Sequence, residues 1–228
     1  MKSAIITFPG SNRDGDVARA LHQSTGQAPA RLWHADHELP AGTDLVVLPG
    51  GFSYGDYLRC GAIAGRARIM DAVRAHAARG GLVLGICNGF QILVESGLLP
   101  GVLMRNANLR FICKMQHLRV ERNDTAFTAA YGPHQIIKVC IAHGEGNYVA
   151  DAQTLQQLEG EGRIAFRYCD AAGEVGGAAN PNGSMHDIAG IYSQKRNVLG
   201  LMPHPENLID ALAGGTDGRG MFEGLAAA

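Results

Sequence analysis

Short apolar runs alternate with segments of helical spacing along most of the chain. Four runs rich in Val, Ile and Leu predict buried strands, at Ala4–Phe8, Asp44–Gly51, Gly81–Ile86 and Asn197–Met202. Between them, the spacing of apolar and charged residues predicts helices over Asp16–Ser24, Ala62–Arg79, Phe90–Ser96 and Thr216–Ala226. Because the strand runs are nearly continuous, both faces of each strand should be covered. The pattern predicts an α/β fold with an open, mostly parallel sheet and helices on both faces.

The pattern changes after Pro100, where the apolar runs become shorter and alternate with polar residues. Phe111–Val120, Gln135–Ala142 and Arg163–Tyr168 are typical of such strands, and "NPNGS" at Asn180–Ser184 is typical of a turn. These strands predict a small antiparallel extension of the sheet. Internal repeats, low-complexity tracts and linkers are absent from the sequence, so we expect one domain over residues 1–228.

Composition narrows the class of protein further. The 228 residues are 46% hydrophobic and 18% charged, which suits a large buried core, and the net charge is −1. A basic stripe interleaved with aromatic residues is missing, so we expect no nucleic-acid partner. The five cysteines are widely spaced and never form C-x-x-C, which indicates a reducing compartment. The apolar run before Pro9 is too short for a signal peptide or a membrane span, so we expect a cytoplasmic protein.

Two glycine-rich loops follow predicted strands, "PGSNRDGD" and "PGGFSYGD". Neither continues into the G-K-[S/T] of a triphosphate loop, and each carries an aspartate, Asp16 or Asp56, where a phosphate site needs a cation. Cys113 and His117 have metal-ligand spacing, but no second pair stands near them in the sequence. We therefore expect neither an ATP site nor a metal site on this chain.

Cys87 is the candidate nucleophile. The sequence Gly85-Ile-Cys-Asn-Gly89 has the form of G-x-S-x-G with cysteine in the centre, between a predicted strand and a predicted helix. A strand that turns at once into a helix strains its central residue and requires small neighbours. We expect the sulfur to be exposed above the sheet edge at a helix N-terminus, where the thiolate is favoured. By contrast, Cys140 in "KVCIA" has the surroundings of a buried core thiol.

Two H-x-E units could supply the base and the residue that orients it: His143-Gly-Glu145 and His204-Pro-Glu206. Pro203 and Pro205 would hold the second pair rigidly, which favours it, but the sequence pattern leaves both possibilities open.

The reaction also needs hydrogen-bond donors that stabilise the negative charge developing on the substrate oxygen. The N–H of Asn88 follows the nucleophile, and Gly50-Gly51 ends another strand at the same predicted sheet edge, where a backbone N–H could approach a substrate closely.

Taken together, these motifs resemble the class I glutamine amidotransferases, which carry a G-x-C-x-G-x-Q elbow and a later H-x-E pair. Five stretches are similar to the glutaminase subunits of phosphoribosylformylglycinamidine synthases: "PGGFSYGDYLRCGAIA", "GICNGFQIL", "AHGEGN", "NPNGS" and "VLGLMPHPE". Arg13 and Asn207 depart from that pattern, which leads us to expect a small residue or cysteine and an arginine at these positions. The resemblance implies a flavodoxin-like fold.

The resemblance also implies roles for individual residues. Cys87 would attack the glutamine side-chain amide, His204 would transfer protons, and Glu206 would orient the histidine. Gly51 and Asn88 would hold the oxyanion, while Gly50 and Gln91 would shape the glutamine pocket.

Ammonia would then pass to a synthetase large subunit, with a small accessory subunit, to convert formylglycinamide ribonucleotide to its amidine in purine biosynthesis. ATP and magnesium would bind that partner, and this chain would bind no cofactor. Two alternatives are a DJ-1/PfpI-type cysteine hydrolase, which would need neither Glu206 nor Gln91, and a catalytically silent regulatory subunit.

Overall fold

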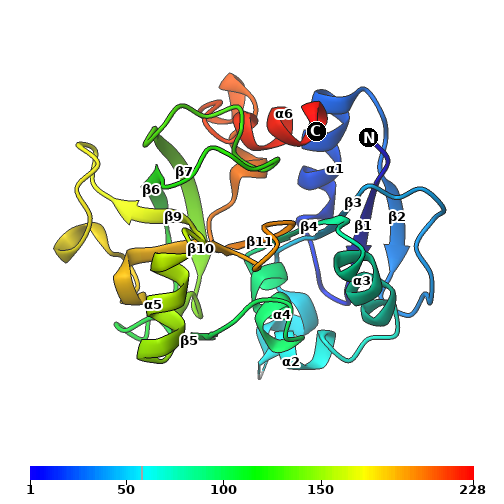
Figure 1. The fold of residues 1–228 in the computed structure, drawn as a ribbon, viewed down its shortest axis with the longest axis horizontal. Coiled ribbons are helices and arrows are strands. Elements are labelled where there is room, and N and C mark those ends of the chain that lie inside the picture. Colours follow the sequence, from blue (N-terminus) through cyan, green and yellow to red (C-terminus); the bar gives the residue numbers. More distant parts are fainter. Residues whose placement is uncertain (58) are drawn as a thin grey trace.

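The computed structural model describes residues 1–57 and 59–228. Within them, one mixed sheet of nine strands runs through the molecule in the order β2-β1-β3-β4-β11-β10-β9-β6-β7 (Figure 1). These strands are β1 (Ser3–Thr7), β2 (Ala30–Trp33), β3 (Leu45–Leu48), β4 (Leu82–Ile86), β6 (Ile112–Val120), β7 (Ile136–His143), β9 (Ile164–Cys169), β10 (Ile188–Tyr192) and β11 (Val198–Leu201). A separate pair joins β5 (Val102–Met104) to β8 (Asn147–Val149).

Strand direction divides the sheet into two parts. From β2 to β11 the strands are parallel, and each is paired with its neighbour by a parallel ladder. From β10 to β7 every pairing is antiparallel. The open, mostly parallel sheet with an antiparallel extension is therefore confirmed. The extension, expected to be small, comprises the four strands β10, β9, β6 and β7.

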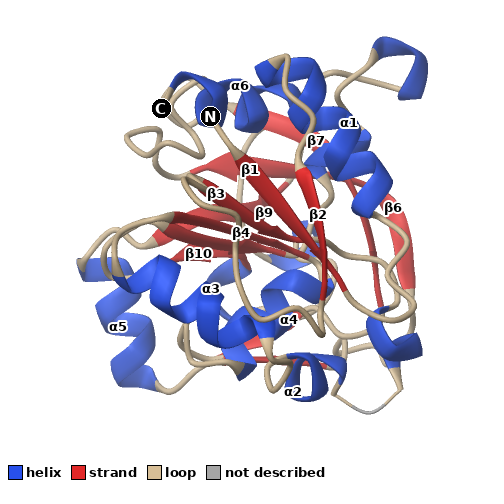
Figure 2. Cartoon of the chain, turned by 90° about the vertical axis from the view of Figure 1, so that its right-hand side faces the viewer, coloured by secondary structure: helices blue, strands red, loops and turns tan. Residues whose placement is uncertain are grey.

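Helices cover both faces of the sheet, as the continuous apolar strands predict. Figure 2 shows α1 and α6 on one side and α2, α3, α4 and α5 on the other. Their bounds are α1 (Asp14–Thr25), α2 (Cys60–Ala64), α3 (Ile69–Ala78), α4 (Asn88–Glu95), α5 (Ala152–Gly160) and α6 (Arg219–Ala227). Short 3-10 turns include η1 (Ser53–Asp56) and η4 (Pro205–Asn207). Among the described residues, no helix is long and apolar enough to span a bilayer.

The single helix predicted over Ala62–Arg79 is wrong, because the chain forms α2 and α3 with a turn between them. The two helices pack on different elements, α2 on α4 and α3 on β4, so one straight helix could not reach both. Arg74 of α3 donates to the carbonyl of Gly65 in the turn at 2.7 Å, which satisfies a helix-end acceptor. Leu58, which belongs to the "PGGFSYGDYLRCGAIA" stretch, lies outside the described residues.

Candidate active site

Cys87 occupies the turn that the sequence predicts. β4 ends at Ile86, α4 begins at Asn88, and Cys87 between them has φ 51° and ψ −106°. The flanking glycines are needed for close packing. A Cβ at Gly85 would lie 2.5 Å from a Leu93 methyl, and one at Gly89 would lie 1.9 Å from the Leu48 carbonyl oxygen. The strained strand–turn–helix geometry is confirmed.

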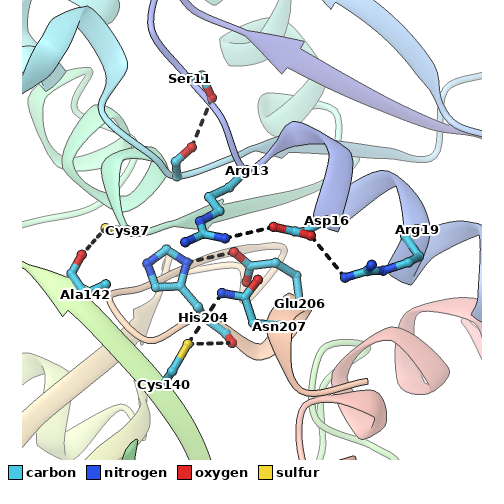
Figure 3. A network of polar contacts seen from close by, with 11 residues as sticks. Ser11, Arg13, Asp16, Arg19, Cys87, Cys140, Ala142, His204, Glu206 and Asn207 are labelled. Carbon is cyan, nitrogen blue, oxygen red and sulfur yellow. Dashed lines mark hydrogen bonds and ion pairs between the residues drawn. The ribbon is translucent and has the colours of Figure 1, made fainter. Parts of the chain in front are cut away.

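His204 comes from the neighbouring strand. β11 pairs with β4 in parallel register, Leu201 opposite Ile86, so the segments that follow both strands leave the sheet at the same edge. Figure 3 shows the His204 ring between Cys87 and Glu206. Its Nδ1 lies 2.7 Å from Glu206 Oε1, and both side chains are buried. The structure thus brings together three of the predicted residues, at the end of two adjacent strands.

Burial and charge act in opposite directions on His204. Burial alone lowers the pKa of a histidine, because it penalises the charged ring. Here the negative charge of Glu206 and the neighbouring Cys87 outweigh burial, and the pKa of His204 is raised well above its ordinary value. The ring is therefore held as a cation that can return a proton.

Gly50 lies against both Cys87 and the His204 ring. A Cβ at this position would lie 3.0 Å from both Cys87 Cβ and His204 Cε1, and 3.2 Å from the Ile86 carbonyl oxygen. Gly51 has φ 91°, and a Cβ there would lie 2.1 Å from Asn12 Oδ1. Gly50 therefore allows the β3–η1 loop to lie directly against the nucleophile, and Gly51 allows the same loop to pack against Asn12, as expected for a loop that shapes a substrate pocket.

The sulfur is less exposed than the sequence leads us to expect. Cys87 is 6% exposed, and its thiol donates to the Ala142 carbonyl oxygen at 3.9 Å. Even so, Cys87 and His204 line a cavity of about 290 Å³, near the lower end of the range for ligand pockets. Charged side chains of both signs also line it: Arg13, Asp56, Arg105, Arg110 and Glu145. The thiol thus lies in a cavity lined by charged and apolar side chains, beneath the surface of the sheet edge.

Asn88 and Gln91 line the same cavity as Cys87 and His204. The Asn88 amide donates to Asp56 Oδ1 and to Gln91 Oε1, both at 2.8 Å, and its Oδ1 accepts from the Ser53 N–H at 3.2 Å. Gln91 in turn donates to the Glu145 carbonyl oxygen at 2.8 Å. Since backbone N–H groups in the first turn of a helix have no partner within it, the Asn88 N–H suits an oxyanion. Gln91 is a buried link between α4 and the loop after β7.

The other H-x-E unit lies in the same cavity, at the end of β7. His143 is buried, and its Nδ1 lies 3.0 Å from Asn106 Oδ1. The Glu145 side chain is turned toward the Arg105 guanidinium, at 3.5 Å, so it does not orient His143. Of the two units that the sequence leaves open, His204-Pro-Glu206 has the histidine–carboxylate contact, which favours it as the base and its orienting residue.

Two asparagines that sequence reasoning missed hold the loop after β7. Asn106 donates to the carbonyls of His143 and Arg110, both at 2.8 Å. Asn182 donates to the Gly146 carbonyl at 2.8 Å, and the hydroxyl of Ser184 donates to the same oxygen at 3.2 Å. The "NPNGS" segment is a turn, as predicted, but it also fixes one wall of the cavity. Its amide-rich composition was the available signal.

Cys140 is half-buried rather than a core thiol. Its sulfur accepts from Asn207 Nδ2 at 3.4 Å, and its carbonyl accepts from the His204 N–H at 2.9 Å. Asn207 and Arg13, the two departures from the family pattern, both lie at the site. Arg13 lines the cavity and pairs with Asp16 at 3.1 Å.

Comparison with known proteins agrees with this geometry. Residues 1–216 match the family model of the CobB/CobQ-like glutamine amidotransferase domain. The chain is 68% identical to phosphoribosylformylglycinamidine synthase subunit PurQ of Bradyrhizobium diazoefficiens, over 99% of this chain and 97% of that one. It is 60% identical to subunit PurQ of Rhodospirillum rubrum, over 99% and 98%. The chain belongs to the PurQ family of glutamine amidotransferases.

A solved structure shows that the fold agrees with this family as well. One chain of the structure of PurLQS from Thermotoga maritima superposes with a TM-score of 0.86 and 41% identity, covering 99% of this chain and 97% of that chain. Family membership makes this chain a glutamine amidotransferase, and the DJ-1/PfpI-type alternative is not supported. The contact between His204 and Glu206 also argues against that alternative, which requires no such carboxylate.

Proposed function

We propose that the chain is the glutaminase subunit of a phosphoribosylformylglycinamidine synthase, and that Cys87, His204 and Glu206 release ammonia from glutamine. The observation that carries the proposal is the strained Cys87 turn beside a histidine whose Nδ1 lies 2.7 Å from a buried carboxylate. A silent regulatory subunit would not need this buried arrangement, which costs backbone strain and desolvation of charge.

In the first half of the reaction, Cys87 attacks the carboxamide carbon of glutamine as a thiolate and forms a tetrahedral intermediate, the thiol proton being the one that the His204 cation carries. The N–H groups of Gly51 and Asn88 donate to its oxyanion. His204 gives a proton to the nitrogen as the C–N bond breaks, so ammonia leaves and a glutamyl thioester remains. Glu206 keeps the ring in position by accepting from Nδ1.

In the second half, water attacks the thioester while His204 takes a proton from it. The C–S bond breaks, glutamate leaves, and the Cys87 sulfur is free again. The cavity suits the rest of the substrate, because Arg13, Arg105 and Arg110 can face a carboxylate and Asp56 and Glu145 an ammonium. Gly50 and Gln91 shape the pocket between these charges.

The ammonia needs a partner that uses it, since free ammonia becomes ammonium in water. The similarity to a chain of PurLQS supports assembly with a PurL-type synthetase and a small PurS-type subunit. We assign ATP and magnesium to that synthetase, because the two glycine loops of this chain lack the lysine of a triphosphate site. We place the assembly in the cytoplasm, consistent with cysteines that never form C-x-x-C.

The test is Cys87→Ser in the assembly reconstituted with its synthetase and small subunit. We expect glutamine-dependent amidine formation to fall by roughly 10⁴-fold or more, whereas formation from added ammonium salt stays at the wild-type rate. Cys113→Ser, at an exposed cysteine of β6, is the matched control and should change neither rate. Equal loss of both rates, or full activity with glutamine, would contradict the proposal.

A further inference from the structure

His143 carries a buried nitrogen that the reaction described above does not use. The residue is 3% exposed and lines the cavity that holds Cys87. Its Nε2 has no hydrogen-bond partner among the residues that the structure describes. An unpaired polar atom inside a protein costs free energy, so in a functional site such an atom points to a ligand that pairs with it.

Asn106 determines which nitrogen of the ring carries the proton. The Asn106 amide nitrogen donates to two carbonyls, those of His143 and Arg110, so its oxygen must face the ring. That oxygen also accepts from the Gly146 N–H at 3.2 Å. Because Oδ1 can only accept, Nδ1 of His143 is the donor across their 3.0 Å contact. Nε2 is left with a lone pair, on the edge of the ring away from Asn106.

The surroundings keep the ring neutral as well. Burial, together with the charge of His204, lowers the pKa of His143 to about 4. Gly146 is also pressed against the ring, since a Cβ there would lie 2.5 Å from Cε1 and Nδ1. The ring is therefore fixed in place as a hydrogen-bond acceptor and cannot donate from Nε2 near neutral pH.

We propose that His143 is a specificity-determining residue whose Nε2 accepts a hydrogen bond from the amide N–H of the bound glutamine side chain. The inference rests on the proposed glutaminase function and deepens it. The carboxamide of glutamine offers two N–H donors, whereas the carboxylate of glutamate offers only acceptors. A fixed lone pair on a residue that lines the Cys87 cavity thus binds the substrate and disfavours the product.

His143→Phe in the reconstituted assembly tests the proposal, because phenylalanine keeps a planar ring but removes the acceptor. The readout is the ratio of the inhibition constant of glutamate to the KM of glutamine. We expect this ratio to fall roughly tenfold, the effect of one hydrogen bond. Iodoacetamide labelling of Cys87 at the wild-type rate shows that the nucleophile is intact. His76→Phe is the matched control, a buried histidine of α3 that contacts the Leu82 carbonyl away from Cys87.

An unchanged ratio in His143→Phe overturns the proposal, and so does a loss confined to kcat. The proposed function fails separately, if wild-type activity with glutamine survives Cys87→Ser. A second measurement does not depend on how the phenylalanine variant folds. In the assembly carrying Cys87→Ser and ¹⁵N-labelled histidine, we expect glutamine to shift the Nε2 resonance of His143 and glutamate to leave it in place. An Nε2 resonance that glutamine does not move also overturns the proposal.

Discussion

Glu206 controls the charge of His204, because it is the nearest carboxylate and both groups are buried. In Glu206→Gln the attraction to the cation disappears, burial dominates, and the pKa of His204 should fall below its wild-type value. We expect glutamine hydrolysis in the assembly to fall by at least about 100-fold, because the neutral amide no longer holds the ring as a proton donor. An NMR titration of the ring gives the pKa directly, and an unchanged value would contradict this account.

The same shift links His204 to stability. Because the pKa of His204 is higher in the folded than in the unfolded state, the protonated ring stabilises the fold. This contribution to the free energy of unfolding is fully present below the ordinary histidine pKa. The contribution is then lost as the pH rises through the raised value. Glu206→Gln should therefore lose this dependence, which is visible as a flatter plot of the free energy of unfolding against pH on the alkaline side.

Gly50→Ala tests whether the arrangement of Cys87 and His204 needs a glycine beside both residues. The new Cβ would lie 3.0 Å from both Cys87 Cβ and His204 Cε1, so one of them has to move by a few tenths of an ångström. We expect kcat with glutamine to fall roughly 100-fold, while the synthetase reaction with ammonium salt is retained. Gly15→Ala in α1 meets no atom within 4 Å and serves as the control, with full activity expected.

Among single residues, the sequence pattern predicts those whose neighbours in the chain constrain the backbone. Cys87 could be predicted because glycines two residues before and after it indicate a strained turn. His204 could be predicted because a proline precedes it and another follows it. Asn106 carries no such mark, and the "NPNGS" composition around Asn182 marks a turn rather than a contact. Their importance arises from contacts with a loop distant in sequence, which a single sequence does not encode locally.

Among the elements, the "NPNGS" turn holds the loop after β7 in place by donating hydrogen bonds to the Gly146 carbonyl. Asn182→Ala removes the hydrogen bonds of its side chain to Gly146 and Tyr168 and leaves the buried Gly146 carbonyl with one donor fewer. We expect a loss of about 1–3 kcal/mol of unfolding free energy and a higher KM for glutamine. Asn123→Ala removes one bond, to the Tyr131 carbonyl, and is the control. Equal effects of the two variants on KM would show that Asn182 does not position the site.

The elements that were missed have recognisable physical reasons. β2 lies at the edge of the sheet and alternates between half-buried and exposed residues, so it lacks the continuous apolar run of its neighbours. β10 contains Gly190 and an irregular register against β9, which weakens its strand pattern. α5 did carry a signal, since Asp151 caps it by accepting from the Thr154 N–H at 2.7 Å. By contrast, the central strands β1, β3, β4 and β11 could be predicted because burial on both faces demands apolar residues throughout.

For the molecule as a whole, four buried tyrosines predict the response to alkali. Burial raises the pKa of Tyr192 to about 12, and it raises the pKa of Tyr131, Tyr148 and Tyr168 further. Because unfolded tyrosine ionises near pH 10, stability should fall as the pH rises above about 10. We expect the tyrosinate absorbance of these four residues to appear together with the loss of the circular dichroism signal. Ionisation of these tyrosines while the fold persists would contradict the prediction.

The position of β11 has a further consequence for synthesis of the protein. Among the strands of the described residues this one comes last along the chain, yet it lies in the middle of the sheet, between β4 and β10. A nascent or prematurely terminated chain that lacks it leaves the edges of two apolar strands open and prone to intermolecular pairing. Such a chain also lacks His204, so under the proposed mechanism we expect no ammonia release on the ribosome before the sheet closes.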